Sequence, residues 1–264
     1  MTQPNTVDVT RYVEASPETV FKVITTPEGF SAWMDGEAEF EAVSGRPFVI
    51  RFPQFAIVMA GTVLEVVANR LLVVTWGVAE GPQADSLPAG STTVRVELKP
   101  EGDGTQVTLT QSRLPADDDP GQHEAGWRFH LSRLQLRANQ AQLAGPLETA
   151  VAAWCSAWSE RDEALRVQEL ANCCVEGVRY ADDYTALEGR SMLAAHVGGT
   201  LHHVGYAQLS PDGPTRICRG EVLMPWRGTR DDGSVAFQGT LHARVGTDGK
   251  FTTVTSFWDH VELG

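Results

Sequence analysis

The side chains best suited to proton transfer lie in the second half of the chain, on a short predicted strand over residues 178–182. Because side chains alternate along a strand, Val178, Tyr180 and Asp182 share one face. A carboxylate in an apolar pocket has a raised pKa and can move a proton to or from a carbon next to a carbonyl group. Removing a proton from that carbon gives an enolate, and the Tyr180 hydroxyl is suited to donate a hydrogen bond to its oxygen. The alternative is structural, with Asp182 and Asp183 beginning a solvated turn.

A histidine on a later predicted strand is the second candidate for acid/base chemistry. His242 points to the same side of that strand as Thr240 and Arg244, and away from the side of Leu241. Imidazole titrates near neutral pH, so His242 is suited to exchange protons with a substrate. The alternative is a surface histidine or one held in a structural hydrogen bond.

Metal, phosphate and serine-nucleophile chemistry are not indicated by the sequence. His196 and the pair His202-His203 suggest a metal site at first, but adjacent histidines point apart and no carboxylate lies at ligand spacing. The chain contains neither a glycine-rich phosphate loop nor a Gly-x-Ser-x-Gly motif. We therefore expect no metal and no cofactor.

Large aromatic side chains are the candidates for binding a ligand. Of the seven tryptophans, we expect Trp76, Trp127, Trp226 and Trp258 to form pocket walls. The alternative is that each is an ordinary core residue.

Composition limits the partners. The 264 residues carry a net charge of −13 without a basic cluster, which excludes nucleic acid and disfavours anionic membrane surfaces. No apolar run approaches the roughly 20 residues of a membrane span, and no signal peptide is recognisable. The four cysteines form no Cys-x-x-Cys pair, so we expect reduced, mostly buried thiols and a cytoplasmic location.

The first half of the chain predicts a curved antiparallel sheet and a long helix. An alternating strand over residues 6–13 is followed by a helix that Ser16 and Pro17 begin, then by a second short helix. Short strands rich in β-branched residues fill residues 38–110, and tight turns separate them. A helix over about residues 122–143 has an apolar stripe and ends the half.

The second half predicts a separate α+β unit. Gly145-Pro146 marks the boundary, which gives units over 1–144 and 145–264. Helices come first, and three strand candidates follow at 215–226, 235–245 and 251–260.

The motifs of the first half resemble the START-like (SRPBCC) superfamily, in the branch named after activators of heat-shock-protein ATPase. They are Ala15-Ser16-Pro17-Glu18-Thr19-Val20-Phe21, Trp33, Gly61-Thr62-Val63-Leu64-Glu65-Val66, Leu71-Leu72-Val73-Val74-Thr75-Trp76, Gly104-Thr105-Gln106-Val107-Thr108-Leu109-Thr110 and His123-Glu124-Ala125-Gly126-Trp127. The resemblance covers residues 7–140. It implies a helix-grip fold with an apolar cavity between sheet and helix.

The second half resembles a SnoaL-like member of the nuclear transport factor 2-like superfamily over residues 147–262. The motifs are Trp158-Ser159-Glu160-Arg161-Asp162, Val178-Arg179-Tyr180-Ala181-Asp182, Leu187-Glu188-Gly189-Arg190, His196-Val197 and Val254-Thr255-Ser256-Phe257-Trp258-Asp259. The resemblance implies a cone-shaped α+β barrel with a deep pocket, an acid/base aspartate at Asp182 and a tendency to form homodimers. Many relatives read Gly-x-Asp where this chain has Gly239-Thr240-Leu241, so His242 would have to replace that carboxylate.

Three functions follow as expectations. The first is an enzyme of the polyketide-cyclase type, which binds a small hydrophobic carbonyl compound and catalyses cyclisation, isomerisation or dehydration through Asp182, Tyr180 and His242. The second is a carrier or sensor that binds a hydrophobic molecule without converting it. The third is a chaperone-type interaction protein.

Overall fold

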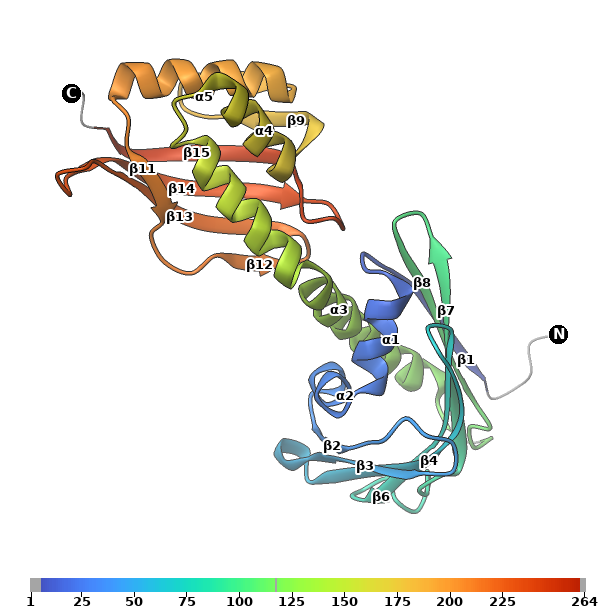
Figure 1. The fold of residues 1–264 in the computed structure, drawn as a ribbon. Helices are drawn as coiled ribbons and strands as arrows, with labels where there is room; N and C mark the ends of the chain where they lie inside the picture. The colour runs from blue at the N-terminus through green and yellow to red at the C-terminus, as the bar shows by residue number, and fades with distance from the viewer. Residues whose placement is uncertain (1–5, 117, 262–264) are drawn as a thin grey trace. The chain divides into compact units, whose positions relative to one another are not determined.

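The structure is a computed structural model that describes residues 6–116 and 118–261. The chain divides into two compact units, unit 1 (Met1–Gln142) and unit 2 (Leu143–Gly264). Each unit packs helices against a largely antiparallel sheet around a hydrophobic core of its own (Figure 1). The expected α+β class is therefore confirmed for both.

Unit 1 follows the order predicted for the first half. Its elements are β1 (Val7–Val13), α1 (Pro17–Thr25), α2 (Pro27–Met34), β2 (Glu37–Glu39), β3 (Pro47–Phe52), η1 (Pro53–Phe55), β4 (Ile57–Val67), β5 (Leu71–Trp76), β6 (Val78–Glu80), β7 (Thr92–Glu101), β8 (Gly104–Ser112) and the first part of α3 (Pro120–Ala157). The strands pair antiparallel in the order β1-β8-β7-β5-β4-β3-β2, and β6 pairs with β4. In Figure 1 the sheet curves around the helices of this unit.

Local signals explain where the first helices begin. The Ser16 hydroxyl accepts a hydrogen bond from the Thr19 backbone amide at 3.2 Å, and Pro17 occupies the first helical position. Thr26 and Pro27 begin α2 in the same way. Asp35, in the left-handed conformation (φ 63°), ends α2.

The long helix α3 differs from the prediction of a break at Gly145-Pro146. It continues from Pro120 to Ala157 with Pro146 inside it. Proline removes one backbone donor and crowds the preceding turn, which normally bends or ends a helix. Here Leu143 and Leu147 on either side of the proline are buried in the core of unit 2. Their helical spacing and burial keep the segment helical despite the proline.

Unit 2 places two further helices against its own sheet. Its elements after α3 are α4 (Glu163–Cys173), β9 (Cys174–Ala181), β10 (Ala186–Glu188), α5 (Arg190–Val204), β11 (Gln208–Pro211), β12 (Arg216–Cys218), β13 (Glu221–Thr229), β14 (Val235–Val245) and β15 (Phe251–Val261). The strand order is β10-β9-β15-β14-β13-β11, and β15 pairs parallel with β9.

The strand expected over residues 215–226 is instead a hairpin. Arg219 and Gly220 both have positive φ (53° and 79°), and they turn the chain between β12 and β13. Two such residues are what a tight hairpin turn requires. None of the described helices is long and apolar enough to cross a membrane.

Candidate functional site

Unit 1 contains a cavity of about 430 Å³. This volume lies within the range of small-molecule sites. The cavity lies between the sheet, the loop after β6, and α3, and its lining is mainly apolar. The lining residues are Met34, Asp35, Phe52, Gln54, Phe55, Ile57, Met59, Trp76, Val78, Gln83, Ser86, Leu87, Gln111, Asp118, Gln122, His123, Gly126, Trp127, Phe129 and His130.

Two tryptophans form a continuous aromatic wall. Trp76 at the end of β5 and Trp127 on α3 have ring centroids 5.4 Å apart and a tilt of 55°. On α3, residues 123, 127 and 130 are spaced by four and three, so they lie on one helical face. That face turns His123, Trp127 and His130 toward the cavity.

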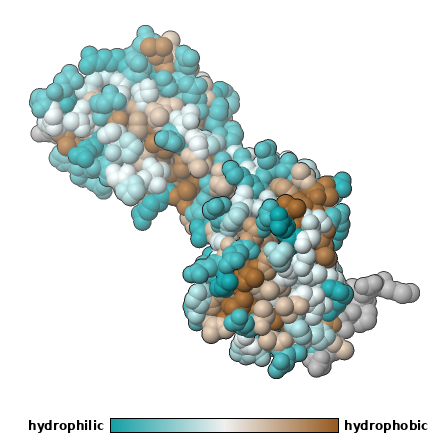
Figure 2. Space-filling model, turned by 60° about the horizontal axis from the view of Figure 1, so that its bottom comes forward, coloured by the Kyte–Doolittle hydropathy of each residue, from teal (hydrophilic) through white to brown (hydrophobic). Residues whose placement is uncertain are grey.

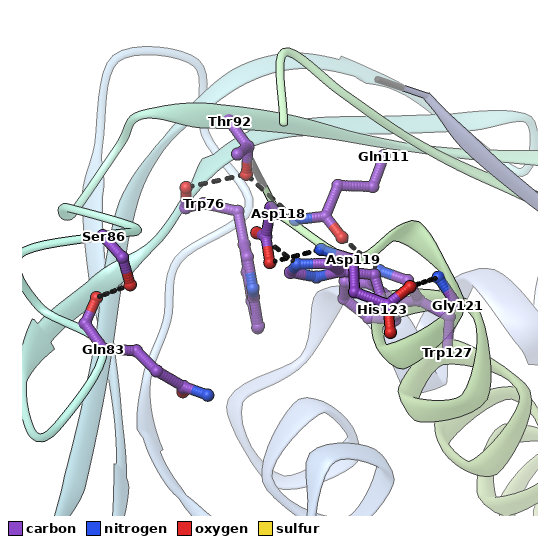
Figure 3. A network of polar contacts seen from close by, with 10 residues as sticks. All are labelled: Trp76, Gln83, Ser86, Thr92, Gln111, Asp118, Asp119, Gly121, His123 and Trp127. Atoms are coloured by element: carbon purple, nitrogen blue, oxygen red, sulfur yellow. Dashed lines mark hydrogen bonds and ion pairs between the residues drawn. The ribbon is translucent and has the colours of Figure 1, made fainter. Parts of the chain in front are cut away.

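A buried chain of hydrogen bonds fixes this wall (Figure 3). The Trp127 indole N–H donates to Gln111 Oε1 at 2.7 Å, and Gln111 Nε2 donates to Thr92 Oγ1 at 3.1 Å. The Thr92 hydroxyl donates to the Trp76 carbonyl oxygen at 2.9 Å. Gln111 and Thr92 are fully buried, so each polar atom needs the partner it has.

A carboxylate and a histidine lie together at the start of α3. His123 Nε2 and Asp118 Oδ2 are 2.7 Å apart, and both side chains line the cavity (Figure 3). Asp119 accepts a hydrogen bond from the Gly121 amide at 2.9 Å, which holds the loop before the helix in place. A histidine oriented by a carboxylate is an arrangement that can exchange a proton with a bound molecule.

His130 is neutral at physiological pH. Burial lowers its pKa to about 4, and the Arg133 guanidinium acts in the same direction, whereas the Asp35 carboxylate opposes them. Its Nδ1 is buried without a hydrogen-bond partner among the described residues. A neutral imidazole has one donor and one acceptor nitrogen, so His130 has unused hydrogen-bonding capacity beside the cavity.

Exposed aromatic rings stand at the edge of the cavity. Phe55 is 67% exposed and Phe129 is 58% exposed, although both line the cavity. The surface of unit 1 in Figure 2 shows hydrophobic side chains among hydrophilic ones. An apolar molecule entering the cavity therefore meets apolar side chains at its edge.

In unit 2, Asp182 is the centre of a polar cluster. Its Oδ2 accepts from the Tyr180 hydroxyl at 3.0 Å and lies 2.9 Å from His196 Nε2. Its Oδ1 accepts from the backbone amides of Tyr184 and Thr185, at 2.9 and 2.8 Å. The side chain is only 1% exposed, so the solvated turn considered for Asp182 is wrong, although the residue does close a turn. Burial and the neighbouring Asp182 charge raise the pKa of Tyr180.

The aromatic pocket beside this cluster is nearly filled. Its lining residues are Trp154, Trp158, Leu209, Trp226, Phe237, Ser256 and Trp258, and its volume is about 10 Å³. That is about the space one water molecule needs. The indole nitrogens of Trp158 and Trp258 are buried without a hydrogen-bond partner among the described residues. The two tryptophans expected as walls in this half, Trp226 and Trp258, therefore lie against each other, with centroids 4.9 Å apart.

His242 does not join Asp182. Its side chain is 50% exposed on β14, and its Nε2 lies 3.1 Å from Glu221 Oε2. Glu221 also binds Arg244 on the same exposed face. The alternation of side chains along β14 explains why His242 lies apart from Asp182. Leu241 and Ala243 on either side of it are buried, so the His242 side chain lies on the opposite, exposed face.

Several polar residues of these sites were not among the sequence candidates for proton transfer, and His196 was considered only as a metal ligand. His196 lies one residue before buried Val197 and three after buried Leu193, so the helical pattern places it at the margin of the apolar face. His123 and His130 flank Trp127 at helical spacing and carry the same signal. Gln111 on β8 has no such signal, because only the folded chain brings it to α3, and Asp118 reads from the sequence only as part of an acidic loop before that helix.

Comparison with known proteins gives a family for unit 1. Residues 14–138 match the family model described as Activator of Hsp90 ATPase homolog 1-like protein. No curated protein matches the chain.

Several solved structures are similar to parts of the chain. A protein from Mesorhizobium loti is 26% identical, covers 50% of this chain and 94% of its own, and has a TM-score of 0.44. The Aha1 dimer from Colwellia psychrerythraea is 22% identical, covers 49% of this chain and 92% of its own, and has a TM-score of 0.42. A SnoaL-like family protein from Agrobacterium tumefaciens is 22% identical, covers 44% of this chain and 99% of its own, and has a TM-score of 0.41. The family model thus shows that residues 14–138 are similar to the Activator of Hsp90 ATPase homolog 1-like family.

Proposed function

We propose that unit 1 binds a small, mainly apolar molecule in its cavity. The observation that carries the proposal is a cavity of about 430 Å³ with an aromatic wall that buried hydrogen bonds hold in place. Removing apolar surface from water contributes roughly 25 cal/mol per Å². A rigid apolar wall stabilises such a ligand without the entropic cost of ordering side chains on binding.

This proposal favours a carrier or sensor over an enzyme in unit 2. The unit 2 pocket of about 10 Å³ has no room for a substrate unless the tryptophans move. The unit 1 cavity needs no such movement. Its polar groups, His123 with Asp118 and His130, are suited to orient the polar end of a ligand.

The first test is a variant that fills the cavity. Gly126 lies on α3 in the cavity lining, and a Cβ added there meets no atom within 4 Å. Gly126→Leu therefore projects an apolar side chain toward the cavity without a backbone clash, and it improves helix propensity. Gly199→Leu on α5 is the matched control, since Gly199 is equally unobstructed and lies in unit 2.

Native mass spectrometry and calorimetry with 2-naphthalenemethanol measure the effect. We expect the wild type and Gly199→Leu to bind alike and Gly126→Leu to bind at least about tenfold more weakly, the effect of about 1.4 kcal/mol. Equal binding by all three chains would place the ligand outside the unit 1 cavity.

Acid/base chemistry in unit 2 is a second candidate function, with an isomerase-like reaction on a carbonyl compound. The buried cluster of Tyr180, Asp182 and His196 favours it, because a carboxylate bonded to two titratable groups is 1% exposed beside an aromatic pocket. Asp182 would transfer the proton and Tyr180 would stabilise the enolate. Trp226 and Trp258 would then have to separate to admit the substrate.

Deuterium exchange at the carbon next to the carbonyl of 2-tetralone tests this second candidate by NMR. The candidate predicts exchange above the buffer rate and at least a ~100-fold decrease in Asp182→Asn. His242→Ala is the matched control and should exchange like the wild type, because His242 lies on the exposed face. Exchange at the buffer rate by the wild type would exclude this proton transfer.

A further inference from the structure

We infer that the unit 1 cavity selects an uncharged ligand that carries a hydroxyl group, and that His130 hydrogen-bonds to that hydroxyl. The inference rests on the proposed function, because it names the class of molecule that the same cavity takes. Two independent features of the lining carry it: the charges present, and the unused hydrogen-bonding capacity of His130.

The charges of the lining argue against an anionic ligand. The charged lining residues are the carboxylates Asp35 and Asp118, and the lining contains neither lysine nor arginine. A ligand carboxylate would be removed from water without a cation to pair with it, which weakens its binding. Fatty-acid-like and phosphate-bearing molecules are therefore disfavoured.

The cationic groups that contact the two lining carboxylates are already engaged. His123 lies 2.7 Å from the Asp118 carboxylate, so its positive form would be neutralised there. Arg133 binds the Asp35 carboxylate at 2.7 Å and also donates to the carbonyl oxygens of Ala32 and Trp33. Both lining carboxylates are thus paired within the protein, and among the described lining residues no unpaired charge favours a ligand of opposite sign.

His130 supplies the specific contact. Its ring lines the cavity and packs against Trp127 at 5.9 Å between centroids. Nδ1 is buried without a partner among the described residues, so Nε2 is the ring nitrogen that a molecule in the cavity can reach. A hydroxyl both donates and accepts, so it suits a neutral imidazole whichever ring nitrogen carries the hydrogen.

Three probes on one ring system test the ligand class in the full-length chain. They are 2-naphthalenemethanol, 2-naphthoate and 2-methylnaphthalene, which differ only in an alcohol, a carboxylate or a methyl group. Calorimetry at pH 7.5 gives each dissociation constant. We expect the alcohol to bind at least about tenfold more tightly than the carboxylate, because the carboxylate lacks a cationic partner in the lining.

Variants at His130 test the contact itself. His130→Phe should weaken binding of the alcohol about fivefold, the effect of one neutral hydrogen bond, and leave binding of 2-methylnaphthalene within about twofold. His130→Asn keeps a donor and an acceptor and should restore preference for the alcohol. His203→Phe, at an exposed position on α5, is the matched control and should leave all three affinities unchanged.

The outcomes separate the two proposals. Equal binding of 2-naphthoate and the alcohol would overturn the inference about charge and leave the proposed cavity function standing. Equal loss of alcohol and methyl probes in His130→Phe would overturn the role of His130. Binding of none of the probes by the wild type would overturn the proposed function and the inference with it.

Discussion

The hydrogen bonds behind the tryptophan wall predict a large and specific loss of stability in unit 1 when Gln111 is replaced. Gln111→Met keeps the length of the side chain but removes both polar atoms from a fully buried position. The Trp127 indole N–H then has no acceptor at 2.7 Å, and Thr92 loses the donor at 3.1 Å. Thr92 keeps its own donation to the Trp76 carbonyl oxygen.

The size of the effect follows from these contacts. Leaving a buried donor without a partner costs about 1–3 kcal/mol, and a lost ordinary hydrogen bond costs about 0.5–1.5 kcal/mol. We therefore expect Gln111→Met to lower the free energy of unfolding of unit 1 by about 2–4 kcal/mol. In a Trp127→Phe background there is no indole N–H to be left without an acceptor. The same substitution should therefore lower the free energy of unfolding by about 1–3 kcal/mol less than it does in the wild type.

Hydrogen exchange followed by mass spectrometry measures the change in the free energy of unfolding of unit 1 in the full chain. Peptides from β7 and β8 report the opening of unit 1 separately from unit 2. Gln238→Met on β14 is the matched control, because Gln238 is exposed and should change stability by less than about 0.5 kcal/mol. A loss below about 0.5 kcal/mol for Gln111→Met, or an equal loss with and without the Trp127 indole, would refute the reasoning.

Three further predictions concern single groups. The pKa of His130 falls from 6.5 in the unfolded chain to about 4 in the folded chain, so the unfolded state binds more protons between these values. Stability should therefore fall as pH decreases from about 6.5 to 4, by at most about 1.4 kcal/mol per pH unit, and urea titrations of His130→Phe should show a flatter dependence. Iodoacetamide should modify exposed Cys218 and spare Cys155, whose pKa burial raises to about 11; modification of Cys155 in the native chain, seen by peptide mass mapping, would contradict this. We also propose self-association through the sheet of unit 2, where Phe257 on β15 is 51% exposed; light scattering should then give a dimer mass for the wild type and a monomer mass for Phe257→Ser.

The fold of unit 1 could be predicted because its signals are local. Ser16 with Pro17 begins a helix through contacts within one turn, and the apolar, β-branched run Leu71–Trp76 predicts a strand, which the structure buries on both faces. The break expected at Gly145-Pro146 failed because a local helix breaker was outweighed by tertiary burial of the residues around it. The helix propensities of the residues alone do not include the stabilisation that comes from tertiary burial.

The candidate sites were less accessible to the same reasoning. Tyr180 and Asp182 share a strand face by periodicity, and the structure indeed brings their side chains together. His242 lies outside the cluster, and His196 on α5 takes the position of the second titratable group. The pairing of a strand residue with a helix residue depends on packing between elements, which spacing along one strand does not encode.

The central claim is that the unit 1 cavity is the ligand site, and the indole N–H signals of the seven tryptophans test it most directly. A ¹H–¹⁵N NMR titration with 2-naphthalenemethanol, with Trp76→Phe and Trp127→Phe used to assign two of the signals, reports each ring separately. We predict that the signals of Trp76 and Trp127 shift with the probe while those of Trp226 and Trp258 stay in place. Shifts confined to the tryptophans of unit 2, or no shift at all at saturating probe, would contradict the account.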